Sequence, residues 1–225
     1  MLYVYPQVMI VDRFNPKEII KKIEMAGRTC YQSYDKTTND PSKFIQALIK
    51  RGHTSVLEHA SLSFRIRCNR GISHELVRHR IASYSQESTR YCKYDDDVVF
   101  IKHCMPEVWD IQEKADKQCE DTYIGMLNEG LKPEIAREAL NNNLKTEVYV
   151  TMNMRSLRNF FTLRCDSHAH PYMKEIAIPF LLEMKDQLPA LFGDIPYDEE
   201  FYKKYLEVIL DNRSVVFYNY EYKCD

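Results

Sequence analysis

The chain has 225 residues, a formal net charge of −2 and 28% charged residues. A chain of this length suits one domain and can bury a substantial core. The near-balanced charge provides no overall positive field, which disfavours a nucleic-acid-binding protein coated with Lys and Arg.

The cysteines and the N-terminal segment indicate the compartment. The seven cysteines are odd in number and never spaced as Cys-x-x-Cys, which is typical of reduced thiols: Cys30, Cys68, Cys92, Cys104, Cys119, Cys165 and Cys224. The first residues lack the basic and apolar stretches of a signal peptide, and no apolar run approaches the roughly 20 residues that span a bilayer. We therefore expect a cytoplasmic protein with no membrane partner.

The first third of the chain predicts a strand, two helices and a second strand. Residues 2–11 are apolar and rich in strand-forming residues, although Pro6 indicates an edge position or a bulge. A helix is expected from Asn15-Pro16 through Met25, and another from residues 40–49 that ends at Gly52. Residues 60–68 alternate between apolar and polar side chains, the pattern of a half-buried strand.

The remaining chain predicts mainly helices. We expect a helix from residue 72 to about 82, a Ser-rich loop over 83–90, a long charged helix over 107–131 and a short one over 133–140. A strand over 146–152 precedes a helix over about 155–164 and an amphipathic helix over 171–188, which Pro189 stops. Residues beyond 198 predict a helix and a docked tail. Without repeats or linkers, residues 1–225 predict one α+β domain, with 198–225 as an extension packed on it.

Residues 78–90 concentrate anion-binding groups. Three arginines, one histidine and three serines lie within these thirteen positions, and guanidinium and hydroxyl groups are the donors that a phosphate ester needs. On a helix, Arg78 and Arg80 would project about 200° apart, so either the helix ends here or its two sides meet different anions. An Arg-His-Arg sequence by itself is more often a set of solvated charges at a helix end. The following Ser88 and Arg90 favour the anion site.

A second polar group lies in the helix expected over about 155–164. Arg155 and Asn159 are four residues apart and share one face, whereas Arg164 falls on the inward stripe with Leu157, Phe160 and Phe161. An inward guanidinium needs an acidic partner or a bound ligand. The alternative is that Arg164 lies in solvent or pairs with Asp166 at the helix end.

The histidines do not have metal-site spacing. His53, Glu58 and His59 lack the i, i+4 spacing of a zinc-binding helix, and His168 and His170 have no companion cluster. We therefore expect no metal. There is no glycine-rich phosphate loop, so a nucleotide or flavin phosphate must be held by side chains and helix ends.

The pattern Arg-His-Arg-x-x-Ser-x4-Ser-x-Arg over residues 78–90 resembles the signature of the flavin-dependent thymidylate synthases. Other segments are similar and occur in the same order, together covering about residues 50 to 170: Gly-His-x4-Glu-His at 52–59, Ser-His-Glu-Leu-Val at 73–77, Ala-Arg at 136–137, and Asn-x-Arg-Ser-Leu-x-Asn-x4-Arg at 153–164.

This resemblance implies a fold, an assembly and a reaction. The fold is α+β, with a central, mostly antiparallel sheet flanked by helices, as in thymidylate synthase complementing proteins. The assembly is a homotetramer with active sites at subunit interfaces. The reaction is reductive methylation of dUMP to dTMP, with FAD carrying the hydride, methylenetetrahydrofolate supplying the carbon and NADPH reducing the flavin.

The resemblance also implies site residues. Those similar to flavin contacts are Ser55, Arg78, His79, Arg80, Gln86, Asn153, Met154, Arg155 and Asn159. Those similar to the dUMP site are Glu75, Leu76, Val77, Arg78, Gln86, Glu87, Ser88, Thr89, Arg90, Arg137 and Arg164. Arg164 matches the arginine that polarises the uracil ring, and His53 is expected near the flavin or the folate.

Two other functions suit parts of the same pattern. An RNA- or nucleotide-binding module without catalysis would use the Arg- and Ser-rich loop alone, and its affinity would fall steeply with salt. A flavoprotein that reduces another substrate would share the flavin residues. Ser88 has no adjacent base to activate it as a nucleophile, so we assign it to substrate binding and orientation; the nearest cysteine is Cys92.

Overall fold

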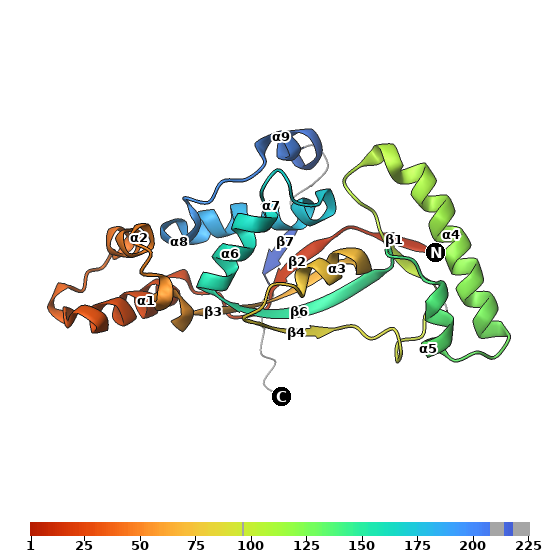
Figure 1. Ribbon diagram of the computed structural model, residues 1–225, viewed down its shortest axis with the longest axis horizontal. Coiled ribbons are helices and arrows are strands. Elements are labelled where there is room, and N and C mark those ends of the chain that lie inside the picture. The colour runs from red at the N-terminus through yellow and green to blue at the C-terminus, as the bar shows by residue number, and fades with distance from the viewer. Residues whose placement is uncertain (96, 208–213, 218–225) are drawn as a thin grey trace, which may run out of the picture.

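The computed structural model describes residues 1–95, 97–207 and 214–217 (Figure 1). Its strands form a five-stranded sheet in the order β4-β6-β3-β2-β7 and a separate pair, β1-β5. Their bounds are β1 Leu2–Val4, β2 Gln7–Ile10, β3 Ser61–Asn69, β4 Ala82–Gln86, β5 Val99–Ile101, β6 Lys145–Asn153 and β7 Val215–Phe217.

The sheet is mostly antiparallel. β3 and β6 form its centre and pair antiparallel from Ser61 opposite Asn153 to Asn69 opposite Lys145. β4 joins β6 and β2 joins β3 in the same sense, whereas β7 runs parallel to β2. The expected α+β fold with a central, mostly antiparallel sheet is therefore confirmed.

The helices cover one side and both ends of this sheet (Figure 1). α3, α6 and α7 lie over the same side, α1 and α2 lie at one end, and α4 and α5 lie at the other. Their bounds are α1 Pro16–Tyr31, α2 Ser42–Lys50, α3 Arg70–Leu76, α4 Trp109–Asn128, α5 Pro133–Ala136, α6 Met154–Arg164, α7 Pro171–Gln187, α8 Pro189–Phe192 and α9 Glu199–Phe201. No helix among the described residues is both long enough and apolar enough to cross a membrane.

The start of α1 is as predicted, whereas Pro6 breaks a strand and forms neither a bulge nor an edge position. The Asn15 side chain accepts a hydrogen bond from the Glu18 N–H and Pro16 occupies the first turn, so α1 starts where its cap indicates. Pro6 divides the strand expected over 2–11 into β1, which pairs with β5, and β2, which joins the main sheet. The interruption is consistent with the missing N–H of proline.

The prediction for residues 72–90 is partly wrong. α3 ends at Leu76, and residues 83–90 do not form one loop because β4 occupies Ala82–Gln86. Exposed Ser83 and Ser85 alternate with half-buried Ala82, Tyr84 and Gln86. This period of two is a strand pattern. The serines lie on the solvent side of β4, which is an edge strand of the sheet.

An aromatic core holds α6 and α7 against the sheet. Phe161 of α6 packs edge-on against Phe180 of α7 and Phe192 of α8, with ring centroids 5.1 and 5.5 Å apart. Phe180 in turn meets Phe64 of β3 at 5.0 Å. The inward stripe predicted for the α6 segment is confirmed, since Leu157, Phe160 and Phe161 are fully buried. This packing fixes the position of Arg164 at the end of α6.

The segment beyond residue 198 is only partly helical. α9 is followed by a wide helical turn over Tyr202–Leu206, and β7 then adds a strand to the sheet beside β2. The remainder of the expected extension, residues 208–213 and 218–225, lies outside the described residues, as does Cys224. The other six cysteines are free thiols.

Candidate active site

The Arg-His-Arg sequence lies in the turn between α3 and β4. Because α3 ends at Leu76, the two arginines are not on opposite faces of a helix; the helix ends before them, one of the two alternatives left open by the sequence. Arg78 and Arg80 are exposed, whereas His79 is buried. The turn therefore presents two guanidinium groups outward and one imidazole inward.

His79 lies against the end of α6. Its Nε2 accepts a hydrogen bond of 2.8 Å from Arg164 Nε, and its ring packs edge-on against Phe160 at 5.1 Å. The Tyr84 hydroxyl of β4 contacts the backbone oxygens of Leu76 and His79 at 3.1 and 2.5 Å. Burial and, secondarily, the charge of Arg164 lower the pKa of His79 from 6.5 to about 4. The imidazole is consequently neutral at physiological pH and available as an acceptor.

This lowered pKa predicts acid sensitivity. Between about pH 6.5 and pH 4 the unfolded chain binds a proton at His79 that the folded chain does not bind. The free energy of unfolding therefore falls as the pH drops through this window, and the contribution of His79 is fully present above it. We expect the unfolding temperature of His79→Gln to depend less on pH in this window than that of the wild type, because Gln does not titrate. Equal pH dependence of the two proteins in thermal unfolding scans would contradict the assignment.

Arg164 has an acidic partner across the α3–α6 contact. Its Nη1 donates to Glu75 Oε2 at 2.8 Å and its Nη2 to the Glu75 backbone oxygen at 3.3 Å, while the guanidinium side chain remains 21% exposed. Asp166, the alternative partner, contacts His168 instead. The guanidinium is thus oriented by a carboxylate and an imidazole, yet one part of it stays accessible to a ligand.

The end of β4 contains two engaged polar side chains. Gln86 Nε2 donates to the Ser73 hydroxyl of α3 at 2.9 Å and to the Thr146 hydroxyl of β6 at 3.2 Å. The Glu87 carboxylate accepts from the Tyr94 hydroxyl at 2.8 Å and from Lys145 Nζ at 3.0 Å. Both side chains are half-buried, and their contacts fix the start of the following loop.

The loop after β4 brings together a second cluster of residues, which contains two arginines. Arg137 Nη1 approaches the buried Thr89 hydroxyl at 3.4 Å, although the two residues are 48 positions apart. Arg90 forms an ion pair with Glu134 at 3.8 Å and remains more than half exposed. The Ser88 backbone oxygen accepts from the N–H groups of the two residues after Arg90, which closes the loop into a tight turn. Two guanidinium groups and two hydroxyls are therefore clustered beside β4.

A third group surrounds the 3₁₀ segment Thr54–His59. A cavity of about 350 Å³ there is lined by side chains that include His53, Ser55 and Arg155. His53 Nδ1 lies 2.8 Å from the Tyr31 hydroxyl. Arg155 Nη1 donates to Glu58 Oε1 at 2.6 Å, and this pair is exposed. The contact joins the two family segments at 52–59 and 153–164.

The other predicted residues at the ends of α3 and α6 differ in accessibility. The Asn153 side chain caps α6 by accepting from the Ser156 N–H at 2.8 Å, and Asn159 is exposed. Met154 and Leu76 point into the core and are buried, whereas Val77 is exposed. Ligand contacts from Met154 or Leu76 would therefore come from their backbone groups.

The chain alone provides an incomplete enclosure for a dinucleotide. A cavity of about 350 Å³ is near the lower limit of the sites that enclose drug-sized molecules. The donor set does fit an anionic flavin nucleotide, since Arg78, Arg80 and Arg155 are exposed guanidinium groups near hydroxyl-bearing segments. Among the described residues, no group of three or more His, Cys, Asp or Glu side chains could hold a metal ion.

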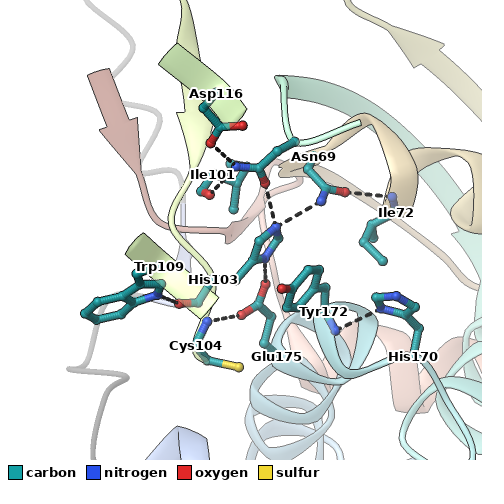
Figure 2. A network of polar contacts seen from close by, with 11 residues as sticks. Asn69, Ile72, Ile101, His103, Cys104, Trp109, Asp116, His170, Tyr172 and Glu175 are labelled. Atoms are coloured by element: carbon teal, nitrogen blue, oxygen red, sulfur yellow. Dashed lines mark hydrogen bonds and ion pairs between the residues drawn. The ribbon is translucent and has the colours of Figure 1, made fainter. Parts of the chain in front are cut away.

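One buried polar network was missed by the sequence reasoning. His103, Glu175 and Asp116 are nearly inaccessible, and Figure 2 shows them in one network. His103 contacts Glu175 directly, and Asn143 lies between His103 and Asp116. A signal for part of it was available: Lys174 and Glu175 interrupt the apolar run of α7, and charged residues at buried positions are almost always paired. Lys174 indeed contacts Asp198 at 2.8 Å.

Residues 11–190 match the family described as thymidylate synthase complementing protein. The chain belongs to this family. The flavin-dependent thymidylate synthase of Geobacter sulfurreducens is 36% identical over 185 residues, which cover 76% of this chain and 80% of that protein. The flavin-dependent thymidylate synthase of Pyrococcus furiosus is 38% identical over 167 residues, which cover 70% and 68%. The resemblance expected from the motifs is confirmed.

A solved structure agrees with this family assignment at the level of the fold. The UMP/dUMP methylase PolB from Streptomyces cacaoi, bound with 5-Br dUMP, matches with a TM-score of 0.72 and 22% identity. The match covers 91% of this chain and 98% of that chain. This member of the thymidylate synthase complementing protein family therefore has the same overall arrangement of helices and sheet.

Proposed function

We propose that this chain is a flavin-dependent thymidylate synthase, which converts dUMP to dTMP with methylenetetrahydrofolate as carbon donor. The observation that carries the proposal is the half-buried Arg164, held by Glu75 and His79 beside the Arg-His-Arg turn. The names of its relatives support a flavin and a thymidylate product, and the dUMP analogue in the methylase structure supports the nucleotide.

The dUMP site is proposed to combine Arg164 and its partners with the arginines and hydroxyls of the loop after β4. Arg164 faces the uracil and stabilises negative charge that develops on the ring, an effect that is large where water is excluded. Glu75 orients that guanidinium, because it fixes two of its donors. The phosphate is held beside the loop after β4, where Arg90 and Arg137 provide charge and Ser88 and Thr89 provide hydroxyls. Leu76, Val77, Arg78, Gln86 and Glu87 complete the proposed set.

The flavin site is proposed to use the turn after α3 and the start of α6. Arg78, Arg80 and Arg155 bind the anionic part of FAD, and Asn159, Ser55 and His79 supply neutral polar groups. Gln86, Asn153 and Met154 lie on the strand and helix that flank these groups. When bound and reduced, the flavin would supply the hydride, and NADPH is the proposed reductant of the flavin.

Ser88 is assigned to binding, and the buried cysteines are unsuited to nucleophilic attack. Burial raises the pKa of the Cys68 thiol to about 12 and raises the pKa values of Cys104 and Cys165 as well. Such thiols stay protonated, and the thiolate is the nucleophile. Ser88 lies in a closed turn where its hydroxyl is 3.4 Å from the Arg90 N–H. It therefore suits orientation of the phosphate.

The outward Arg78 and Arg80 and the small cavity near His53 support an active site shared between subunits. We propose a cytoplasmic homotetramer in which a partner completes the flavin enclosure and His53 lies near the flavin or folate. A stable monomer in sedimentation at micromolar concentration would contradict the shared site.

A product assay tests the proposed reaction. The protein, incubated with FAD, NADPH, methylenetetrahydrofolate and dUMP, should form dTMP together with tetrahydrofolate. Flavin oxidation without dTMP would favour a reductase of another substrate. A colourless protein with salt-sensitive RNA affinity would favour a binding module.

A further inference from the structure

The buried network in Figure 2 is centred on His103, which follows β5. Its Nδ1 lies 2.5 Å from Glu175 Oε1 of α7, and the second oxygen of Glu175 accepts the Cys104 N–H at 2.7 Å. The imidazole also stacks on Tyr172 with the ring centroids 3.5 Å apart and the planes parallel within 1°. His103 and Glu175 are 4% and 1% exposed. The His103 ring is therefore held at its edge by Glu175 and on its face by Tyr172.

The opposite ring nitrogen connects this pair to α3. A carboxylate at Nδ1 favours the tautomer with the proton on Nδ1, which leaves Nε2 as an acceptor. Asn69 Nδ2 lies 2.9 Å from Nε2 and can donate to it. The orientation of the Asn69 amide is independently determined, because its Oδ1 accepts the Ile72 N–H at 2.7 Å and caps α3. Asn69 therefore joins His103 to the first turn of the helix.

The other end of α3 carries the residue that orients Arg164. α3 has only seven residues, from Arg70 to Leu76, so its cap and Glu75 are less than two turns apart. Glu75 holds the Arg164 guanidinium through its carboxylate and its backbone oxygen. A displacement of the capped end moves Glu75 with it. His103 touches neither Glu75 nor Arg164 in any of its contacts within the described residues, so its effect must pass through α3.

A second set of contacts ties the same histidine to the long helix α4. Asn143 Oδ1 also lies 2.9 Å from His103 Nε2, where it accepts a hydrogen bond only when Nε2 carries a proton, and Asn143 Nδ2 donates to Asp116 Oδ2 of α4 at 2.7 Å. Asp116 also accepts from the Tyr3 hydroxyl at 3.0 Å. Among the described residues, every buried side-chain nitrogen or oxygen has a partner. Well-packed apolar side chains would often be at least as stable as a buried ionic network, so stability alone gives a weak reason for this one.

We propose that His103 and Glu175 are positioning residues that set α3 through Asn69 and thereby hold Glu75 and Arg164 in register with the nucleotide. The inference rests on the proposed function for its kinetic consequence, but its structural part concerns α3 alone. Neither residue contacts substrate. Their contribution is the placement of a guanidinium, and small misplacements of catalytic groups are costly in rate.

Two conservative substitutions interrupt the path at different points. Asn69→Ser keeps a hydroxyl that caps α3, since Ser is as good an N-cap as Asn, but its side chain is too short to reach His103. Glu175→Gln leaves one acceptor oxygen where Glu175 uses two. Either one of these bonds is lost, or His103 accepts from the new amide at Nδ1 and carries its proton on Nε2, where it can no longer accept from Asn69. Trp109→Phe is the matched control, because it removes the Trp109 bond to the His103 backbone oxygen and keeps an aromatic ring beside Lys102, without touching the His103 side chain.

Kinetics and hydrogen exchange are measured on five proteins: the wild type, the two variants, their double variant and the Trp109→Phe control. We expect each of the two variants to lower kcat/KM for dUMP about tenfold with FAD affinity unchanged within about twofold, and the double variant to match the single ones because both act on one path. Backbone amides in residues 70–79 should exchange about tenfold faster in Glu175→Gln, although that residue lies on α7. Trp109→Phe should behave as wild type.

The outcomes separate the two claims. A wild-type protein that makes no dTMP refutes the proposed function, and the exchange rates of residues 70–79 still decide the positioning role. Unchanged exchange in Glu175→Gln overturns the positioning role, as do unchanged dUMP kinetics in an active enzyme. A parallel loss of FAD affinity, dUMP affinity and unfolding temperature also overturns it, since that pattern belongs to a merely structural network.

Discussion

Arg164→Ala is expected to lower the rate of dTMP formation by about 10²–10³-fold, the usual loss when one group that stabilises transition-state charge is removed. FAD affinity should stay within about threefold of wild type, because His79 is the one proposed flavin residue among the hydrogen-bond partners of Arg164, and the guanidinium groups proposed for the flavin phosphates are separate from it. The measurement is a single-turnover assay with reduced flavin, paired with an FAD titration.

The Arg164→Ala measurement needs a control variant and a test of folding. Arg65→Ala removes another arginine, one that lies exposed on β3 and pairs with Glu147, and it should change neither quantity. Equal losses of FAD binding and of dTMP formation in Arg164→Ala would contradict the separation of roles between Arg164 and the flavin residues. Because Arg164 also orients the buried His79 imidazole, an unfolding scan is needed to show that the variant remains folded.

Arg137→Ala is expected to weaken dUMP binding by about 10- to 100-fold, as charged hydrogen bonds contribute about 1.5–3 kcal/mol. Binding of deoxyuridine, which lacks the phosphate, should be nearly unchanged. The contact of Arg137 with Thr89 places its guanidinium beside the Ser88 turn, where a phosphate has both charge and hydroxyl donors. Equilibrium titrations of the flavin-bound protein with each ligand measure the two affinities.

Lys132, just before α5, provides a matched control for Arg137. Lys132→Ala removes one positive charge just before α5 from an exposed side chain, so it tests a general loss of positive field. If the deoxyuridine affinity falls as much as the dUMP affinity in Arg137→Ala, the phosphate assignment is wrong. If Lys132→Ala weakens dUMP as strongly as Arg137→Ala, long-range charge and not contact explains the effect.

The strands and helices with strong periodicity were predictable from the sequence. β3 and β6 alternate clearly, and α1 has a cap and a proline at its start. The inward direction of Arg164 also followed from its position on the stripe of Leu157 and Phe161. Periodicity identifies the face on which a side chain lies, so it could predict that Arg164 needs a partner.

Periodicity could not identify that partner or the end of α3. Glu75 is 89 residues away from Arg164, and only the placement of α3 and α6 over the same side of the sheet brings them together. β4 was missed because its serines have loop-forming composition, whereas its pairing with β6 is a long-range property. The network of His103 and Glu175 joins α7 to the second residue after β5, and no local pattern relates those two positions.

We propose that this protein binds both a flavin and dUMP at adjoining sites, and a flavin absorbance titration tests this proposal most directly. The purified protein, supplied with FAD and freed of excess, should be yellow and should show a saturable change in its visible flavin spectrum as dUMP is added. A protein that neither contains nor takes up FAD, or a bound flavin whose spectrum is indifferent to saturating dUMP, would contradict the account.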